Sequence, residues 1–168
     1  MKNILSSTSL IVFAFAIGTM LFSCGKSGGG GSKVTVTPPA SGHTVKFTIT
    51  VAGSVSPANA GLIILGFGAS DAVNPSNSTI WKVNNIVQKN DSDLGFTGTD
   101  FPQGQTTSIV IESTVPVKNP VANLDFDNGT GLPAYIISFK AEIDGKVKND
   151  DENISITHTN DYIHDYTY

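Results

Sequence analysis

Apolar and polar side chains alternate along several short segments of this chain, as they do in strands that bury one face. Residues 45–51 show the alternation most clearly, because Val, Phe or Ile occupies every second position and Lys or Thr occupies the others. The same period of two recurs in residues 109–111, 137–143 and 154–156. We predict that each of these segments is a half-buried strand.

Two further segments carry strand or turn signals of a different kind. Residues 61–68 (GLIILGFG) form a continuous apolar run framed by glycines, which predicts a strand that is buried on both faces. Asp144-Gly145 follows one of the alternating segments. This pair predicts a two-residue hairpin turn, because both turn positions need a positive φ.

Residues 79–89 fit two patterns. Ile80, Val83 and Val87 have the spacing of one face of a helix, whereas Trp81 and Val83 have the spacing of one face of a strand. We predict a strand here, because the neighbouring segments also have the strand period.

Short strands separated by Gly, Pro, Asn and Asp predict an all-β fold, with a single antiparallel β-sandwich that is immunoglobulin-like or transthyretin-like in outline. We place this domain at residues 44–168, which is long enough for one hydrophobic core. The cysteine pair of true immunoglobulin domains is missing, because Cys24 is the only cysteine in the chain. The domain is therefore not assigned to a family.

The first residues of the chain have the pattern of an export signal. Lys2 is followed by an apolar run, residues 10–22, that is too short to cross a hydrocarbon core of about 30 Å as a helix. The end of this run, Leu21-Phe22-Ser23-Cys24, resembles the lipobox of bacterial lipoprotein signal peptides. The resemblance implies that residues 1–23 are removed and that the Cys24 sulfur carries a diacylglyceryl group. Cleavage after residues 14–16 (AFA) is the alternative, and it would leave an exposed apolar tail.

The expected lipid on Cys24 would tether the domain to a membrane. Residues 24–43 contain a glycine-rich stretch and then Pro38-Pro39, which predicts a flexible linker with a stiffer end. Gly25 follows the cysteine, and resemblance to lipoproteins implies delivery to the outer membrane when that position is not aspartate. We expect the protein to be lipid-anchored there, either on the periplasmic side or on the cell surface.

Charge and motif content narrow the classes of function. The chain has 10 Lys and Arg against 14 Asp and Glu, for a net charge of −4, so nucleic acid is an unsuitable partner. No nucleotide, hydrolase or zinc motif occurs in the sequence. We therefore predict a module for binding, adhesion or assistance to an envelope complex, with no catalysis. A hydrolase with a spatially assembled site and a purely structural envelope component are the alternatives.

The end of the chain is aromatic. Tyr162, His164, Tyr166 and Tyr168 have the same strand phase, so that an extended strand presents them on one face. Such a face could stack on sugar rings of a glycan or take up apolar side chains of an envelope protein. The alternative is that these rings close the sandwich as cross-strand pairs.

Asp125 and Asp127 offer carboxylate oxygens at alternate positions, as the start of a calcium loop does. The positions that should follow in a helix-hand loop are not filled by glycine and glutamate. Asp and Asn also populate turns for a local reason, because their side chains bond the nearby backbone. We expect no cofactor, and calcium is the one metal that these residues could hold.

Overall fold

The computed structural model describes residues 41–53, 55 and 62–168. The predicted signal peptide, Cys24 and the linker as far as residue 40 lie outside the described residues. Within the described part of the chain, no helix is long and apolar enough to cross a membrane.

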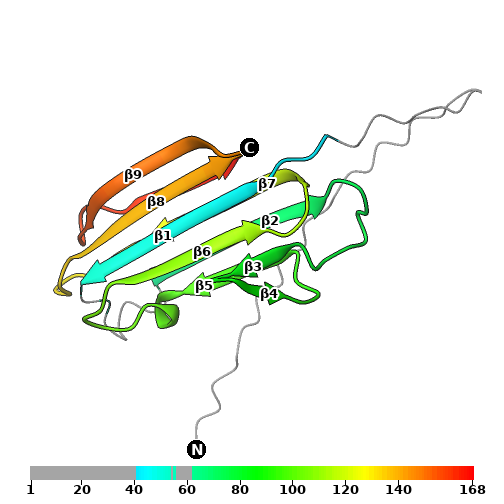
Figure 1. Ribbon diagram of the computed structural model, residues 1–168. Coiled ribbons are helices and arrows are strands. Elements are labelled where there is room, and N and C mark those ends of the chain that lie inside the picture. Colours follow the sequence, from blue (N-terminus) through cyan, green and yellow to red (C-terminus); the bar gives the residue numbers. More distant parts are fainter. Residues whose placement is uncertain (1–40, 54, 56–61) are drawn as a thin grey trace, which may run out of the picture. The chain divides into compact units, whose positions relative to one another are not determined.

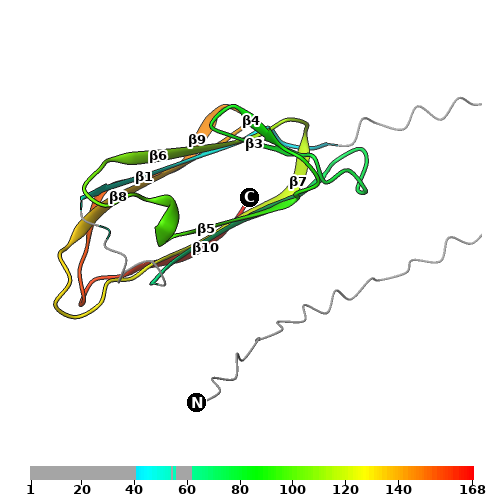
Figure 2. The same ribbon diagram turned by 90° about the horizontal axis from the view of Figure 1, so that it is seen from below.

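The described residues form two antiparallel sheets that face each other, which confirms the predicted all-β sandwich (Figures 1 and 2). The first sheet consists, from edge to edge, of β4 (Ile86–Gln88), β3 (Trp81–Val83), β6 (Thr107–Ser113), β1 (Val45–Gly53), β8 (Tyr135–Ile143) and β9 (Lys146–Ile156). The second sheet consists of β10 (Tyr162–Thr167), β7 (Val117–Phe126), β2 (Ile63–Asp71) and β5 (Asp93–Thr97). A 3₁₀ turn, Gly98–Asp100, follows β5.

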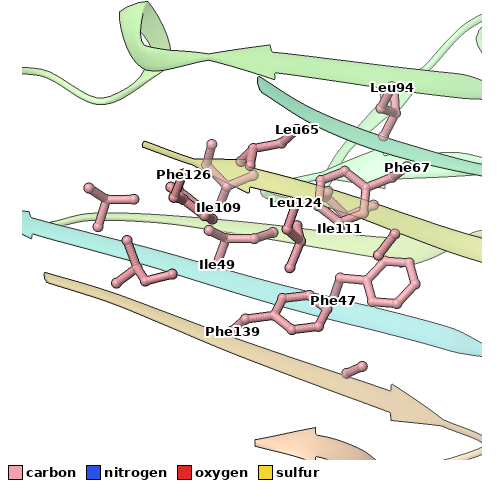
Figure 3. Close-up of a cluster of buried hydrophobic side chains, with 14 of the residues drawn as sticks. Phe47, Ile49, Leu65, Phe67, Leu94, Ile109, Ile111, Leu124, Phe126 and Phe139 are labelled. Carbon is pink, nitrogen blue, oxygen red and sulfur yellow. The ribbon is translucent and has the colours of Figure 1, made fainter. Parts of the chain in front are cut away.

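The core lies between the sheets and is built from the alternating segments. Phe47 and Ile49 of β1 are fully buried, and the same is true of Ile137 and Phe139 of β8. Phe47 meets Phe67 of the opposite sheet with ring centroids 5.3 Å apart. Figure 3 shows Phe47, Phe67 and Phe139 pointing into the space between the layers. The strand predictions for residues 45–51, 109–111, 137–143 and 154–156 are therefore confirmed, in β1, β6, β8 and β9.

The prediction for residues 61–68 was wrong in one respect. The described part of this run is β2, but its outer face is not buried throughout: Leu65 is 1% exposed, whereas Ile64 is 59% exposed. Gly66 and Gly68 share the outer face with Ile64, and Gly66 is partly exposed while Gly68 is buried. Because glycine replaces the polar residues that mark a solvent face elsewhere, the run looked apolar throughout.

Residues 79–89 are extended, as predicted, but they form a hairpin instead of one strand. The strands β3 and β4 pair across Asn84 and Asn85, which both have a positive φ (48° and 68°). Asparagine tolerates this conformation because its short polar side chain bonds locally. Trp81 is buried, and its indole Nε1 donates a hydrogen bond to the carbonyl of Ser92 at 2.9 Å.

The turn at Asp144-Gly145 is confirmed, with φ values of 52° and 71°, and it joins β8 to β9. At the other end of the domain, His43 already belongs to the sandwich. Its backbone N–H and carbonyl bond to Val117 at 2.7 and 2.9 Å. The ordered domain thus includes His43, one residue before the predicted boundary.

Candidate functional site

The C-terminal aromatic residues lie on one face of β10, as predicted. We call Tyr162, His164, Tyr166 and Tyr168 the aromatic column. β10 is an edge strand of its sheet and pairs with β7. Tyr162 is only 6% exposed, whereas Tyr166 and Tyr168 are half-buried against the core and His164 is exposed.

Successive rings of the aromatic column are in contact with one another. Ring centroids are 4.3 Å apart from Tyr162 to His164, 5.6 Å from His164 to Tyr166 and 6.1 Å from Tyr166 to Tyr168. Tyr168 also meets Phe47 of the opposite sheet, with centroids 5.8 Å apart. The column therefore forms one side wall of the sandwich.

The hydroxyl groups of the column bind the edge strand of the other sheet. Tyr162 donates to the Oδ2 of Asp151 at 2.8 Å, and Tyr166 reaches the same oxygen at 3.3 Å. Tyr168 donates to the Oδ1 of Asn149 at 2.8 Å. Because Asp151 and Asn149 belong to β9, these bonds connect the two edge strands and close the sandwich on this side.

Burial raises the pKa of the tyrosine hydroxyls in the column. For Tyr162 the loss of solvent is the largest cause, followed by its hydrogen bonds to Tyr166 and Asp151. Burial is also the main cause of the raised pKa of Tyr166 and of Tyr168. These hydroxyls therefore stay neutral donors over the whole physiological range.

The structure thus shows the arrangement in which the column closes the sandwich. Of the two arrangements predicted for the column, a continuous solvent-facing platform does not form, because Tyr162 is buried and Tyr166 stacks on Phe139; binding at its exposed members stays a prediction. A period of two identifies the residues that share a face, but not which face is turned inward. A ligand can reach the column only at its partly exposed members.

A pocket of about 380 Å³ lies beside the last ring of the column. Its apolar wall consists of Ile143 and Tyr168. The polar lining consists of His43, Asp144, Lys146, Lys148 and Thr167. We call this the edge pocket. The residues that line it come from the segment before β1, from the β8–β9 turn with the start of β9, and from the end of β10. Figure 1 shows the C terminus beside the end of β8.

Asp144 organises one side of the edge pocket. Its Oδ2 accepts a hydrogen bond from the Nδ1 of His43 at 2.7 Å, and its Oδ1 accepts one from the backbone N–H of Thr44 at 2.9 Å. These contacts, with the His43 bond the largest, hold the pKa of the Asp144 carboxyl below its usual range. Asp144 therefore fixes the β8–β9 turn to the start of β1.

Two lysines, Lys146 and Lys148, also line the edge pocket. In the part of the chain that the structure describes, ion pairs involve Lys82, Lys140 and His43, so neither Lys146 nor Lys148 has an acidic partner. Neither lysine was among the site residues predicted from the sequence. Their spacing of two residues directly after the predicted turn was the available signal.

Asp125 and Asp127 lie near the end of β7. Burial is the main cause that raises the pKa of Asp125, and the charges of Asp127 and Asp161 add to it. Over residues 41–53, 55 and 62–168, however, no three His, Cys, Asp or Glu side chains are grouped so that they could hold a metal ion. The expectation that Asp125 and Asp127 hold no calcium stays a prediction.

Comparison with known proteins adds little to this description. No family model matches the chain, and no curated protein matches it. A similar solved structure is the NMR structure of the calcium-bound form of a protein from Parabacteroides distasonis. It has 13% sequence identity and a TM-score of 0.47, and the match covers 77% of this chain and 96% of that one. The two antiparallel sheets place the protein in the structural class of antiparallel β-sandwiches.

Proposed function

We propose that this protein is an outer-membrane lipoprotein whose β-sandwich is a binding module of the cell envelope. The anchoring part of the proposal is supported by the resemblance of residues 21–24 to a lipobox. Two or more acyl chains on Cys24 would hold the protein stably, at about 0.8 kcal/mol for each buried methylene. The residues between Cys24 and His43 would then serve as the tether.

The binding part of the proposal depends on one observation, the edge pocket. Its volume of about 380 Å³ falls in the range of small-molecule sites, and it combines an apolar wall with a few polar groups. That combination suits the end of a glycan or a short segment of an envelope protein. Tyr168, one of the four residues of the predicted aromatic site, belongs to this pocket.

The two alternatives have less support. A hydrolase would use a pair such as His43 and Asp144 to activate a nucleophile, but among the residues that the structure describes no serine or cysteine lines the edge pocket. A structural subunit would present a regular open edge. The edge strand β9 has register shifts and many charged residues, which oppose the addition of another strand.

The anchoring part is tested by replacing the lipidated residue. Cys24→Ser should move the protein from the detergent-soluble membrane fraction to the aqueous periplasmic fraction, because the acyl chains alone hold it. Unchanged fractionation, or a mature chain that begins at Ile17, would contradict the proposal.

The binding part is tested with the full-length protein in detergent and a panel of envelope glycan fragments, acidic and neutral. We expect a subset of the panel to bind. Tyr168→Ala should weaken that binding, whereas Ile86→Ala, at an exposed site on β4, should not. No binding to any fragment or to purified envelope proteins would contradict a binding role.

A further inference from the structure

We propose that the edge pocket binds a sugar ring that carries one carboxylate, as in a uronic acid. This inference rests on the proposed binding function and names the class of ligand. Its starting point is the pair Lys146 and Lys148, which both line the pocket and have no ion pair among the described residues. Two unpaired cations at one pocket are notable in a chain with a net charge of −4.

An irregularity in β9 separates these lysines from the groups that bind the tyrosines. Ala141 pairs with Asn149 and Glu142 pairs with Val147, so Lys148 is an extra residue with no partner on β8. A bulge of this kind changes the phase of a strand. Lys146 precedes the bulge and Lys148 is its extra residue, and both line the pocket. Asn149, directly after the bulge, bonds to Tyr168 instead. The cations are therefore left available for a ligand.

The rest of the pocket favours a small polyhydroxy body. Ile143 and the Tyr168 ring supply the apolar wall that a sugar ring can lie against. Asp144 can accept hydrogen bonds from hydroxyl groups, and the Thr167 hydroxyl can both donate and accept. A volume of about 380 Å³ is at the low end for ligand sites and suits one ring.

The charge of the pocket favours a single acidic group. Two lysines attract an anion, whereas the Asp144 carboxylate, which also lines the pocket, repels a second negative charge. A monoanionic carboxylate thus fits better than a phosphate, which carries close to two charges at neutral pH. A sugar with one carboxylate matches both the cations and the hydroxyl-binding groups.

Calorimetric titration of the full-length protein in detergent tests this assignment, with glucuronate, glucose, benzoate and inorganic phosphate as probes. We expect glucuronate to bind at least about tenfold more tightly than glucose, because a charge-assisted hydrogen bond contributes that much. The double variant Lys146→Gln/Lys148→Gln should lose this preference. The matched control Lys89→Gln/Lys118→Gln removes the same charge from two exposed lysines elsewhere and should keep it.

Several results would overturn the inference. Equal binding of glucose would remove the role of the cations, and equal binding of phosphate or benzoate would remove the specificity for a sugar acid. A double variant that folds, as shown by its circular dichroism, and still prefers glucuronate would do the same. Binding of neutral glycans alone would end this inference but leave the proposed binding function standing, whereas no binding of any glycan or envelope protein would end both.

Discussion

The ring of Tyr166 stacks on the ring of Phe139, with centroids 5.4 Å apart and an angle of 21° between the planes. Tyr166 belongs to β10 and Phe139 to β8, so this pair joins the two sheets. We expect Tyr166→Ala to lower the free energy of unfolding by about 3 kcal/mol, the lower end of the range for truncating a buried aromatic side chain. Denaturant unfolding followed by the fluorescence of Trp81, the only tryptophan, measures this.

The control for this change is Tyr166→Phe. It keeps the stacked ring and removes the hydrogen bonds of the hydroxyl to Tyr162 (2.9 Å) and Asp151 (3.3 Å), so its cost should be about 1 kcal/mol. A cost below about 1 kcal/mol for Tyr166→Ala would mean that the ring is not part of the sandwich wall.

The tyrosines should ionise only when the protein unfolds. Burial is the main cause that raises the pKa of all four, Tyr135, Tyr162, Tyr166 and Tyr168. A raised pKa in the folded state means that their contribution to stability is complete below the unfolded value of about 10 and is lost as the pH rises above it. Tyrosinate absorbance and loss of β circular dichroism should therefore appear together in an alkaline titration. Tyrosinate absorbance in a folded protein near pH 10 would contradict this.

Asp144 should contribute to stability at neutral pH and not in acid. Its folded pKa is lowered, first by the hydrogen bond from His43, so its contribution is present above the unfolded value of about 4 and is lost as the pH falls below it. Asp144→Asn keeps a residue that tolerates the positive φ of this turn and removes the charge. We expect it to lower the melting temperature at pH 7 and to match the parent near pH 3. An equal difference at both pH values would exclude the charge as the cause.

Gly145 should resist replacement for a conformational reason. Its φ is 71°, and no atom lies within 4 Å of an added Cβ, so strain alone opposes a side chain. Gly145→Ala should cost about 1 kcal/mol, and Gly145→Asn should cost less. Gly95→Ala is a suitable control, because Gly95 has an ordinary φ and its added Cβ would be 3.9 Å from the nearest atom, the Leu65 carbonyl oxygen. Equal costs at the two positions would contradict the argument.

Calcium should not stabilise the domain. Asp125 and Asp127 are the candidate ligands, and in the described residues they do not form part of a group of three or more such side chains. Millimolar calcium should therefore leave the melting temperature unchanged. A rise that Asp125→Asn abolishes would instead establish a calcium site.

A strand could be predicted where it buries a single face and its sequence alternates apolar with polar residues. The alternation in β1 and β8 identified buried residues such as Phe47 and Phe139. It failed in β2, because Ile64, Gly66 and Gly68 occupy the outer face without a polar side chain. The hairpin of β3 and β4 was missed because its turn is Asn84-Asn85, without a glycine.

The candidate site was much less predictable. His43, Asp144 and Tyr168 are far apart in the sequence, and they meet only because β1 pairs with β8 while β10 closes the sandwich beside β9. The pattern placed Tyr162 and Tyr166 on one face, but the order of strands decides that this face is inside. Such an order depends on contacts between distant segments, which no local pattern contains.

The position of β1 has a mechanical consequence. The chain enters the domain through His43, and β1 then lies between β6 and β8 in the middle of its sheet. A pulling force applied through the residues before His43 would act along this strand. Hydrogen bonds between antiparallel strands run across that direction, so the bonds on both sides of β1 would be loaded together in shear instead of opening one after another. A force applied at this end of the domain would therefore act on a strand that resists extraction.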